Sequence, residues 1–287
     1  MKFSKLFSIM FMSFVFFGCN ERSEIKMMDN VGAIQKEVLE NSDKNTLVIF
    51  DCDDVLITMN DQIFRIKNQE VVKKCLKSLE KTMPEDLIQK TIENYWSISL
   101  LQGQRKIIDP KMPEFVRNLQ NNKIKTIVLT GVPTAGTLGN IESMATWRVN
   151  DLKNFGYDFS TSFKTLQYKK FTELSKTNPP VYDRGILFSC GATKGQILES
   201  FLKYAHIKPS KIVFLDDRMS NIKSVQETVE RLKIKFVGIN YTGQENFKFD
   251  RSLSEERVKF QLKMLKEKGK FLSDIQADDE MAKEKRE

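Results

Sequence analysis

Acidic pairs follow two apolar segments of the chain at the point where each segment ends. Asp51 and Asp53 come after the first segment, and Asp216 and Asp217 come after the second. A carboxylate can attack phosphorus as a nucleophile, and a second carboxylate two residues further on can exchange a proton with the leaving group and then with water. Four carboxylates in one place would repel each other without a cation, and Mg²⁺ prefers oxygen ligands of this kind. The four aspartates are therefore candidate ligands of Mg²⁺.

A hydroxyl, a glycine and a lysine elsewhere in the chain complete the candidate site. Thr130 and Gly131 follow a third apolar run, and Lys194 opens a predicted helix that precedes the second acidic pair. Thr130 can donate a hydrogen bond to a transferring phosphoryl group, and Lys194 supplies positive charge to its oxygens. An acidic residue after a strand is, by itself, most often a turn former or a helix cap. The interpretation therefore depends on the combination of these residues.

The chain has a single histidine, His206, and this limits the alternative chemistries. A histidine-based zinc site, a Ser-His-Asp triad or a Cys-His dyad would each depend on that one residue. Four cysteines in 287 residues are too few for a disulfide scaffold. We therefore expect carboxylates to carry any chemistry.

The elements that must position these residues alternate along the chain. Apolar runs without a polar alternation predict strands that are covered on both faces, and the segments between them predict helices. Strands are predicted at 46–50, 125–129, 185–188, 211–215 and 236–239, and helices at 31–39, 112–120, 141–152, 193–205 and 219–232. This alternation predicts an α/β fold with a Rossmann-like parallel sheet and helices on both faces. In such a sheet the carboxyl ends of the strands meet at one edge, where ligands bind.

Two further segments extend this core, which we place at 45–250. Residues 60–110 are helix-prone and are predicted to be a helical cap insertion. Residues 251–287 are dense in charge and are predicted to be a surface helix that frays into a disordered tail. Residues 19–44 are predicted to be a polar tether that runs into a short helix.

Residues 1–18 are predicted to be an export signal. Two lysines precede an apolar run from Leu6 to Gly18, which is too short to span a bilayer. The end of this run resembles a bacterial lipobox, in which Cys19 becomes the lipidated first residue of the mature chain. We therefore expect a bacterial protein in the periplasm or attached to the outer membrane through a lipid anchor on Cys19. An uncleaved anchor is the alternative.

Composition excludes several classes of protein. The chain has 46 basic and 38 acidic residues, a net charge of +8, and 40% hydrophobic residues. These values exclude a disordered polymer, a collagen-like repeat and a multi-span membrane protein. The lysines are interleaved with acids rather than gathered in an aromatic-studded patch, so we expect no nucleic-acid partner. The positive charge can still attract anionic substrates or lipid headgroups.

Over about residues 45 to 240, the chain resembles the haloacid dehalogenase (HAD) superfamily in four motifs that occur in the right order. The motifs are Asp51-x-Asp53-x-Val55 after a strand, Leu129-Thr130-Gly131, Lys194, and Ile212-Val-Phe-Leu-Asp216-Asp217-x-x-x-Asn221. Many members carry an acid where Asn221 stands. The chain is similar both to secreted acid phosphatases, which typically have Glu where Asp54 stands, and to an uncharacterised group of exported bacterial HAD-type proteins.

The resemblance implies a role for each motif. Asp51 would be the nucleophile that becomes an aspartyl-phosphate, and Asp53 the general acid and base, with its backbone carbonyl on Mg²⁺. Thr130, Gly131 and Lys194 would hold the phosphoryl group, Asp216 and Asp217 would complete the metal site, and Asn221 would orient a water or a ligand.

We therefore predict a Mg²⁺-dependent phosphatase of the cell envelope that acts on a small phosphorylated substrate. The alternative is a HAD-fold binding protein at the bacterial envelope with weak or no catalysis, which Asn221 and the long segment at 131–193 would permit.

Overall fold

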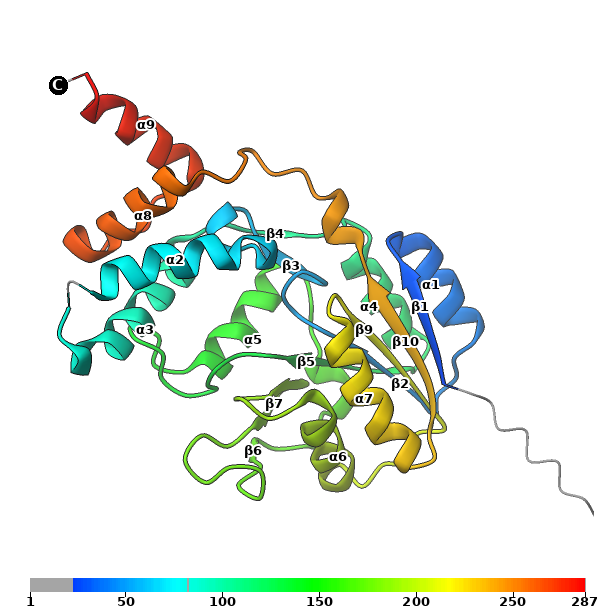
Figure 1. The fold of residues 1–287 in the computed structure, drawn as a ribbon. Coiled ribbons are helices and arrows are strands. Elements are labelled where there is room, and N and C mark those ends of the chain that lie inside the picture. The colour runs from blue at the N-terminus through cyan, green and yellow to red at the C-terminus, as the bar shows by residue number, and fades with distance from the viewer. Residues whose placement is uncertain (1–22, 82, 287) are drawn as a thin grey trace, which may run out of the picture.

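The computed structural model describes residues 23–81 and 83–286 (Figure 1). The predicted export signal at 1–18 and the predicted lipidation site, Cys19, lie outside these ranges. Within them, no helix is both long enough and apolar enough to cross a membrane.

An eight-stranded sheet forms the centre of the molecule (Figure 1). In spatial order its strands are β1 (Glu24–Met28), β10 (Lys235–Tyr241), β9 (Lys211–Asp216), β2 (Thr46–Phe50), β5 (Lys125–Thr130), β8 (Ile186–Phe188), β7 (Val181–Asp183) and β6 (Lys169–Lys170). The strands from β1 to β8 in this order are parallel, whereas β7 pairs antiparallel with β8 and β6 pairs antiparallel with β7. The predicted α/β fold with a Rossmann-like parallel sheet is confirmed. Strand β2 lies between β9 and β5, so the ends of these three strands are neighbours.

Helices cover both faces of the sheet because successive residues of each central strand point to opposite sides. Val48 and Phe50 of β2 belong to one core, and Leu47 and Ile49 belong to the other. The first core is covered by α1 (Val31–Glu40), α4 (Met112–Asn121) and α5 (Met144–Asn154), and the second by α6 (Lys194–Tyr204) and α7 (Met219–Arg231). Burial on both sides explains why the strand sequences are continuously apolar.

The chain leaves the sheet after β2 and forms a second, two-stranded antiparallel sheet from β3 (Ile57–Met59) and β4 (Arg105–Ile107). Between these strands lie η1 (Gln62–Phe64), η2 (Ile66–Asn68), α2 (Gln69–Glu80) and α3 (Glu85–Gln102). The segment predicted to be a helical insertion, 60–110, therefore contains α2 and α3. That this segment acts as a cap over the site stays a prediction.

The C-terminal segment forms two helices, of which the first packs against this insertion and the second packs on the first. After η4 (Gly243–Asn246), the chain forms α8 (Glu255–Lys268) and α9 (Asp274–Glu284). Val258, Leu262 and Leu265 of α8 share a core with residues of α2 and α3, and Figure 1 shows the three helices side by side. The segment is helical, as predicted, but α8 is packed against α2 and α3 instead of lying free at the surface, and the helical structure continues in α9 to Glu284. The abundant charges of this segment concealed apolar residues at helical spacing, which form a buried stripe.

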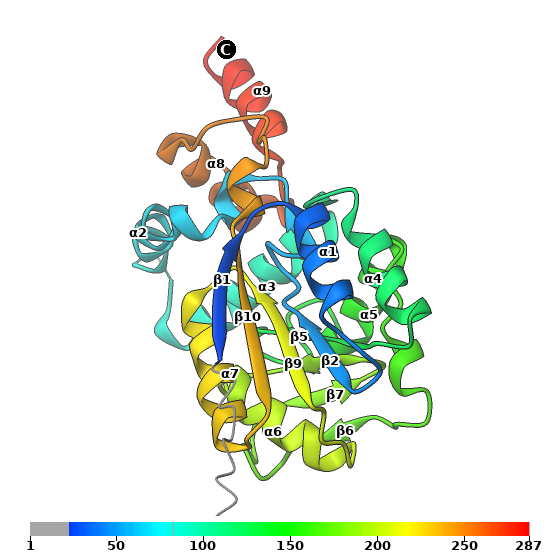
Figure 2. The same cartoon turned by 90° about the vertical axis from the view of Figure 1, so that its right-hand side faces the viewer.

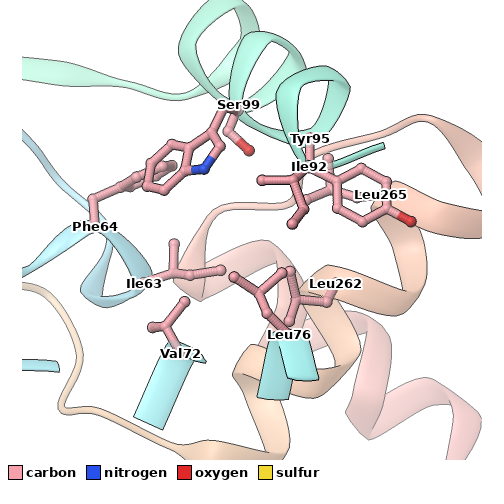
Figure 3. Close-up of a pocket in the computed structure, with 10 residues that line it drawn as sticks. Ile63, Phe64, Val72, Leu76, Ile92, Tyr95, Ser99, Leu262 and Leu265 are labelled. Atoms are coloured by element: carbon pink, nitrogen blue, oxygen red, sulfur yellow. The ribbon is translucent and has the colours of Figure 1, made fainter. Parts of the chain in front are cut away.

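A small cavity of about 30 Å³ remains among the side chains of α2, α3 and α8 (Figure 3). Ile63, Leu76 and Leu265 face it, and its lining is almost wholly apolar. A cavity of this volume has room for a water or two at most. It therefore offers neither the size nor the polar groups that a phosphate ester needs.

The N-terminal tether also differs from the prediction. Glu24–Met28 forms the edge strand β1, which pairs in parallel with β10, instead of a polar tether. β1 carries two charged residues, Glu24 and Lys26, and none of its residues is fully buried, as an edge strand permits, so the segment lacks the apolar run of the central strands. The remaining short elements are the connection η3 (Ser160–Phe163) and the loops around it.

Candidate active site

The carboxyl ends of three neighbouring strands bring the predicted site residues together. Asp51 directly follows β2, Asp216 is the last residue of β9, and Thr130 is the last residue of β5. Phe50 is in register with Leu215 and Val128, so the residues that follow these positions lie at one level of the sheet. The backbone N–H of Asp51 donates to the carbonyl of Leu215 at 2.8 Å, which joins the two acidic segments.

Three carboxylates and a lysine form the centre of the site. One carboxylate oxygen from each of Asp51, Asp216 and Asp217 lies within 4.8 Å of the others. The Nζ atom of Lys194, at the start of α6, is 2.7 Å from Asp51 Oδ1 and 2.6 Å from Asp216 Oδ2. Lys194 and Asp216 are buried, and only 7% of Asp51 is exposed. A buried charge cluster of this kind is costly unless its charges compensate each other.

The two aspartates after β9 have different surroundings. Asp216 accepts hydrogen bonds from Lys194, from the backbone N–H of Arg218 at 2.8 Å, and from Asn221 Nδ2 at 3.0 and 3.1 Å. Both of its oxygens are therefore engaged. In contrast, Asp217 Oδ1 is buried without a hydrogen-bond partner among the described residues. Such an orphaned oxygen is costly, and a bound cation would satisfy it.

Burial is the largest cause of the raised pKa values of Asp51 and Asp217. It raises the pKa of Asp51 well above its usual range; Lys194 opposes the increase, and Asp216 and Asp217 add to it. Burial, together with the charges of Asp216 and Asp54, raises the pKa of Asp217 to about 7. Burial alone would lower the pKa of Lys194, but the charges of Asp51 and Asp216 outweigh burial, and the pKa is raised. A cation among the carboxylates would favour their ionised forms.

Thr130 presents a second orphaned group. Only 1% of Thr130 is exposed, and its Oγ1 atom has no hydrogen-bond partner among the described residues. Its backbone carbonyl accepts from the N–H of Ser189 at 3.0 Å, so the backbone is paired while the hydroxyl is not. The next residue, Gly131, is exposed, and a Cβ atom there would meet nothing within 4 Å. Crowding in this structure therefore does not explain the glycine.

The Asp53 carboxylate lies outside the three-carboxylate cluster and forms an ion pair with an arginine. Arg148 Nη2, on α5, is 3.1 Å from Asp53 Oδ1 and 3.2 Å from Asp53 Oδ2. Arg148 is buried, whereas just over half of the Asp53 side chain is exposed. Arg148 also pairs with Asp151 at 3.4 Å, and Asp151 pairs with Arg105 of β4 at 2.8 Å. This chain of ion pairs connects Asp53 to the hairpin that carries α2 and α3.

Both arginines of this network also contact one indole ring. The guanidinium carbons of Arg105 and Arg148 lie 4.9 and 5.0 Å from the ring centre of Trp147, within range of cation–π attraction. Reasoning from sequence did not find this network, because its members are far apart in the chain. The only local signal was the spacing of three residues between Arg148 and Asp151 on one helix.

Asp54 belongs to the turn after β2 rather than to the acidic cluster. Its backbone has a φ angle of 65°, in the left-handed region that aspartate tolerates better than most residues. Its Oδ1 atom accepts from Arg65 at 2.5 Å and from the hydroxyl of Thr58 at 2.7 Å. These contacts tie the turn to the start of the inserted segment.

The cysteines contribute to packing. Cys52, between the two acidic residues, is wholly buried and belongs to the core beneath α1, α4 and α5. Burial raises the pKa of its thiol well above the usual range, so the thiol is unreactive near neutral pH. Cys75 and Cys190 are also buried and unpaired.

Fold and site together define an α/β protein with an acidic, lysine-containing site at the carboxyl edge of a Rossmann-like sheet. The chain belongs to the family described as protein of unknown function (DUF2608), whose model matches residues 25–277.

Several known proteins are similar to the chain. An uncharacterised protein of Rickettsia bellii is 25% identical over 237 residues, which cover 76% of this chain and 77% of that protein. One from Rickettsia conorii is 24% identical over 246 residues, or 82% of each chain. A putative outer membrane protein of Chlamydia pneumoniae is 34% identical over 65 residues, or 23% of this chain and 25% of that protein. Among solved structures, a haloacid dehalogenase-like family hydrolase from Streptococcus pneumoniae is 14% identical, covers 72% of this chain and 92% of that chain, and has a TM-score of 0.41.

Proposed function

We propose that the protein is a Mg²⁺-dependent phosphatase of the HAD type that acts through an aspartyl-phosphate on Asp51. The observation that supports this most is the convergence, at one edge of the sheet, of Asp51, Lys194, the orphaned Asp217 oxygen and the orphaned Thr130 hydroxyl. The two orphaned groups differ in kind, because the first accepts and the second can donate. A cation would satisfy the first, and an anionic phosphoryl group would satisfy the second.

The residues present fit a magnesium ion. Asp51 and Asp217 would hold it with their carboxylates, and the backbone carbonyl of Asp53 would be a third ligand, as the resemblance implies. Asp216 is a weaker candidate because both of its oxygens already accept hydrogen bonds. We assign it instead to the positioning of Lys194. When bound, Mg²⁺ would offset the negative charge that the phosphoryl oxygens bring to the carboxylates.

The residues of the chain can carry out both half-reactions. Asp51 Oδ1 is held by Lys194 and by the N–H of Cys52 at 2.7 Å, while Oδ2 receives no hydrogen bond from the described residues. Oδ2 would attack phosphorus, so that a new P–O bond forms as the ester P–O bond breaks. Asp53 would give its proton to the departing oxygen. Asp53 would then take a proton from the water that hydrolyses the aspartyl-phosphate.

We assign this activity to the bacterial cell envelope and to small phosphorylated substrates. The basic start and the short apolar run at 1–18 support export, and Cys19 supports a lipid anchor in the membrane. The name of the Chlamydia relative, a putative outer membrane protein, agrees with this location.

The direct test is hydrolysis of phosphate monoesters by the purified full chain, with and without Mg²⁺. We expect excess EDTA to lower turnover at least about 100-fold, because the carboxylates would then repel the substrate's charge, and we expect added Mg²⁺ to restore it. Turnover that is unaffected by EDTA would contradict the proposal. The absence of turnover across a panel of alkyl, aryl and sugar phosphates would favour the alternative, a binding protein with weak or no catalysis.

Replacing Thr130 by Val should have opposite effects on stability and on activity. Valine has the same shape and removes a buried hydroxyl that lacks a partner, so the melting temperature should stay the same or rise. Loss of the donor to the phosphoryl group should lower kcat/KM by about 100-fold. Thermal unfolding and steady-state kinetics on the same samples measure both quantities.

Thr126, on the same strand, provides the matched control. Its hydroxyl accepts from Gln120 at 3.0 Å and lies 3.2 Å from Ser162 Oγ, so Thr126→Val should cost about 1 kcal/mol of stability and leave kcat/KM unchanged. Equal behaviour of the two variants would contradict the role assigned to Thr130.

Arg148→Met tests whether the ion pair with Asp53 positions the general acid. A poor leaving group needs a proton from the acid, whereas dinitrophenolate does not. We therefore expect kcat/KM to fall about 100-fold on an alkyl phosphate and only a few-fold on dinitrophenyl phosphate. The ratio of the two rates in one sample does not depend on the fraction of protein that is folded. The control is Arg184→Met, which removes an arginine that pairs with Asp183 and should leave the ratio of the two kcat/KM values unchanged. If Arg148→Met has the same ratio as the parent, Arg148 does not position the general acid.

A further inference from the structure

The opposite edge of the sheet, where the parallel strands begin, carries a cavity of about 270 Å³. The cavity lies at the starts of β2 and β5 and beside the loop that follows α6. Its lining consists of Lys44, Asn45, Thr46, Leu47, Lys125, His206, Ile207, Lys208 and Pro209. It is therefore separate from the carboxylate site, which lies at the other ends of β2 and β5.

Basic side chains line this cavity without acidic partners. Lys44, Lys125 and Lys208 form no ion pair with any described residue, and no carboxylate belongs to the lining. The nearest acid along the chain, Asp43, is engaged in its own turn, where Oδ1 accepts from Asn45 N–H at 2.9 Å and from the Thr46 hydroxyl at 3.1 Å. Lys125 Nζ lies 5.4 Å from the ring centre of Phe163, but no carboxylate of a described residue neutralises any of the three lysines. A concave surface with several such cations attracts an anion. The cavity lacks the carboxylates that would favour a cation.

The first described strand, β1, begins at the same edge of the sheet. β1 begins at Glu24 and runs parallel to β10, in register with Val237 near the start of that strand. β1 therefore begins at the edge of the sheet that carries the cavity (Figure 2). The sequence of residues 1–22 includes the apolar run and Cys19, and the chain from Cys19 to Glu24 can extend at most about 18 Å. Any membrane attachment through that segment would hold the basic cavity close to lipid headgroups.

We infer that this cavity binds the phosphate headgroup of an anionic lipid, so that the amino edge of the sheet faces the membrane and the carboxyl edge faces away. Both the excess of positive charge at the cavity and the position of the start of β1, five residues after Cys19, point to a bilayer surface as the source of the anion. Exposed lysines within a Debye length of such a surface are attracted to it, and lysines on the far side are screened. The inference does not depend on the proposed phosphatase activity.

Flotation of the full chain with lipid vesicles tests the inference. The vesicles contain phosphatidylcholine alone or with 30% phosphatidic acid, and the protein is the parent or the variant Lys44→Gln/Lys125→Gln/Lys208→Gln. Because every arm contains residues 1–22, their contribution is the same throughout. From the attraction of individual lysines to an anionic surface, we expect the triple change to lower partitioning onto anionic vesicles on the order of 100-fold, with little effect on neutral vesicles.

A second triple variant is matched in charge and separates position from net charge. Lys90, Lys223 and Lys270 are exposed on α3, on α7 and after α8, and none is in an ion pair with a described residue. Their replacement by Gln should lower partitioning less than about threefold, because these lysines lie outside the screening distance of the membrane. Equal losses in the two triple variants would overturn the inference. Equal melting temperatures of the parent and the variants would show that the fold is intact. The double variant Lys44→Gln/Lys208→Gln, which keeps Lys125, should show a smaller loss of partitioning onto anionic vesicles than the triple variant.

Inorganic phosphate distinguishes the lipid from a soluble anion. If the cavity serves the membrane, millimolar phosphate should compete weakly, and the lysine dependence should appear only with anionic vesicles. The assignment to lipid would be overturned if phosphate binding required Lys44, Lys125 and Lys208 while partitioning onto vesicles did not depend on them.

Discussion

Replacing Asp51 by Asn should abolish Mg²⁺-dependent phosphate ester hydrolysis, with a fall in turnover of at least about 10³-fold. The amide keeps the shape of the side chain but cannot form an acyl phosphate as the carboxylate does. The variant should fold, because Lys194 keeps its contact with Asp216 at 2.6 Å. Burial disfavours the ionised form of Asp51, so the neutral amide should leave the melting temperature unchanged or raise it.

The control for this variant is Asp279→Asn, which makes the same chemical change at an exposed position on α9. It should retain parental turnover. A second measurement follows the intermediate: after brief incubation with labelled substrate and acid quenching, the parent should retain label on Asp51, whereas Asp51→Asn should retain none. Parental activity in Asp51→Asn would eliminate the aspartyl-phosphate mechanism even if the protein hydrolysed phosphate esters.

Replacing Lys194 by Met should produce the largest loss of stability. The lysine is 4% exposed and is the cation between two buried carboxylates, so its removal leaves Asp51 and Asp216 without compensation. Breaking a buried ion pair from one side costs about 3–5 kcal/mol, which corresponds to a fall of about 10 °C in melting temperature for a chain of this size. Urea or thermal unfolding measures this cost.

The pH dependence of this loss has a definite sign. Lys194 has a raised pKa in the folded protein, so its stabilising charge is fully present below its unfolded pKa of 10.5 and is lost only as the pH rises through the folded value. The difference in the free energy of unfolding between Lys194→Met and the parent should therefore persist throughout the neutral pH range. Lys203→Met, on the same helix, removes an exposed lysine and should change stability little. A Lys194→Met protein as stable as the parent would show that the cluster is not held by this lysine.

Sequence alone predicted the parts of the fold that depend on local pattern. The strands at 46–50 and 125–129 were predictable because both faces are buried, which makes their sequences continuously apolar. Lys194 was predictable at the start of a helix because Thr193 caps it, with its hydroxyl accepting from the N–H of Gln196. Once these strands lie parallel, the positions of Asp51 and Asp216 follow from chain direction.

The features that sequence did not predict depend on contacts between distant segments. Nothing in the local pattern around Arg148 indicates that it pairs with Asp53, which is 95 residues away. The unpaired state of the Thr130 hydroxyl is a property of its neighbours, and a sequence does not reveal which polar groups lack partners. Likewise, the buried face of α8 is defined by α2 and α3, which lie far earlier in the chain.

The packing of α8 on the inserted helices, and the bonds that join the start of α9 to the start of the insertion, have a consequence for how the protein matures. The N–H of Gln62 donates to the Asp274 carboxylate at 2.9 Å across 212 residues, and the N–H of Asp274 donates to Asp61 at 2.7 Å. A nascent chain that has emerged only as far as β10 already contains every strand of the sheet, but its inserted helices still lack the surface that buries them. Those helices can reach their final state only after synthesis is nearly complete, so truncation of the last thirty or so residues should leave an aggregation-prone intermediate instead of a smaller folded protein.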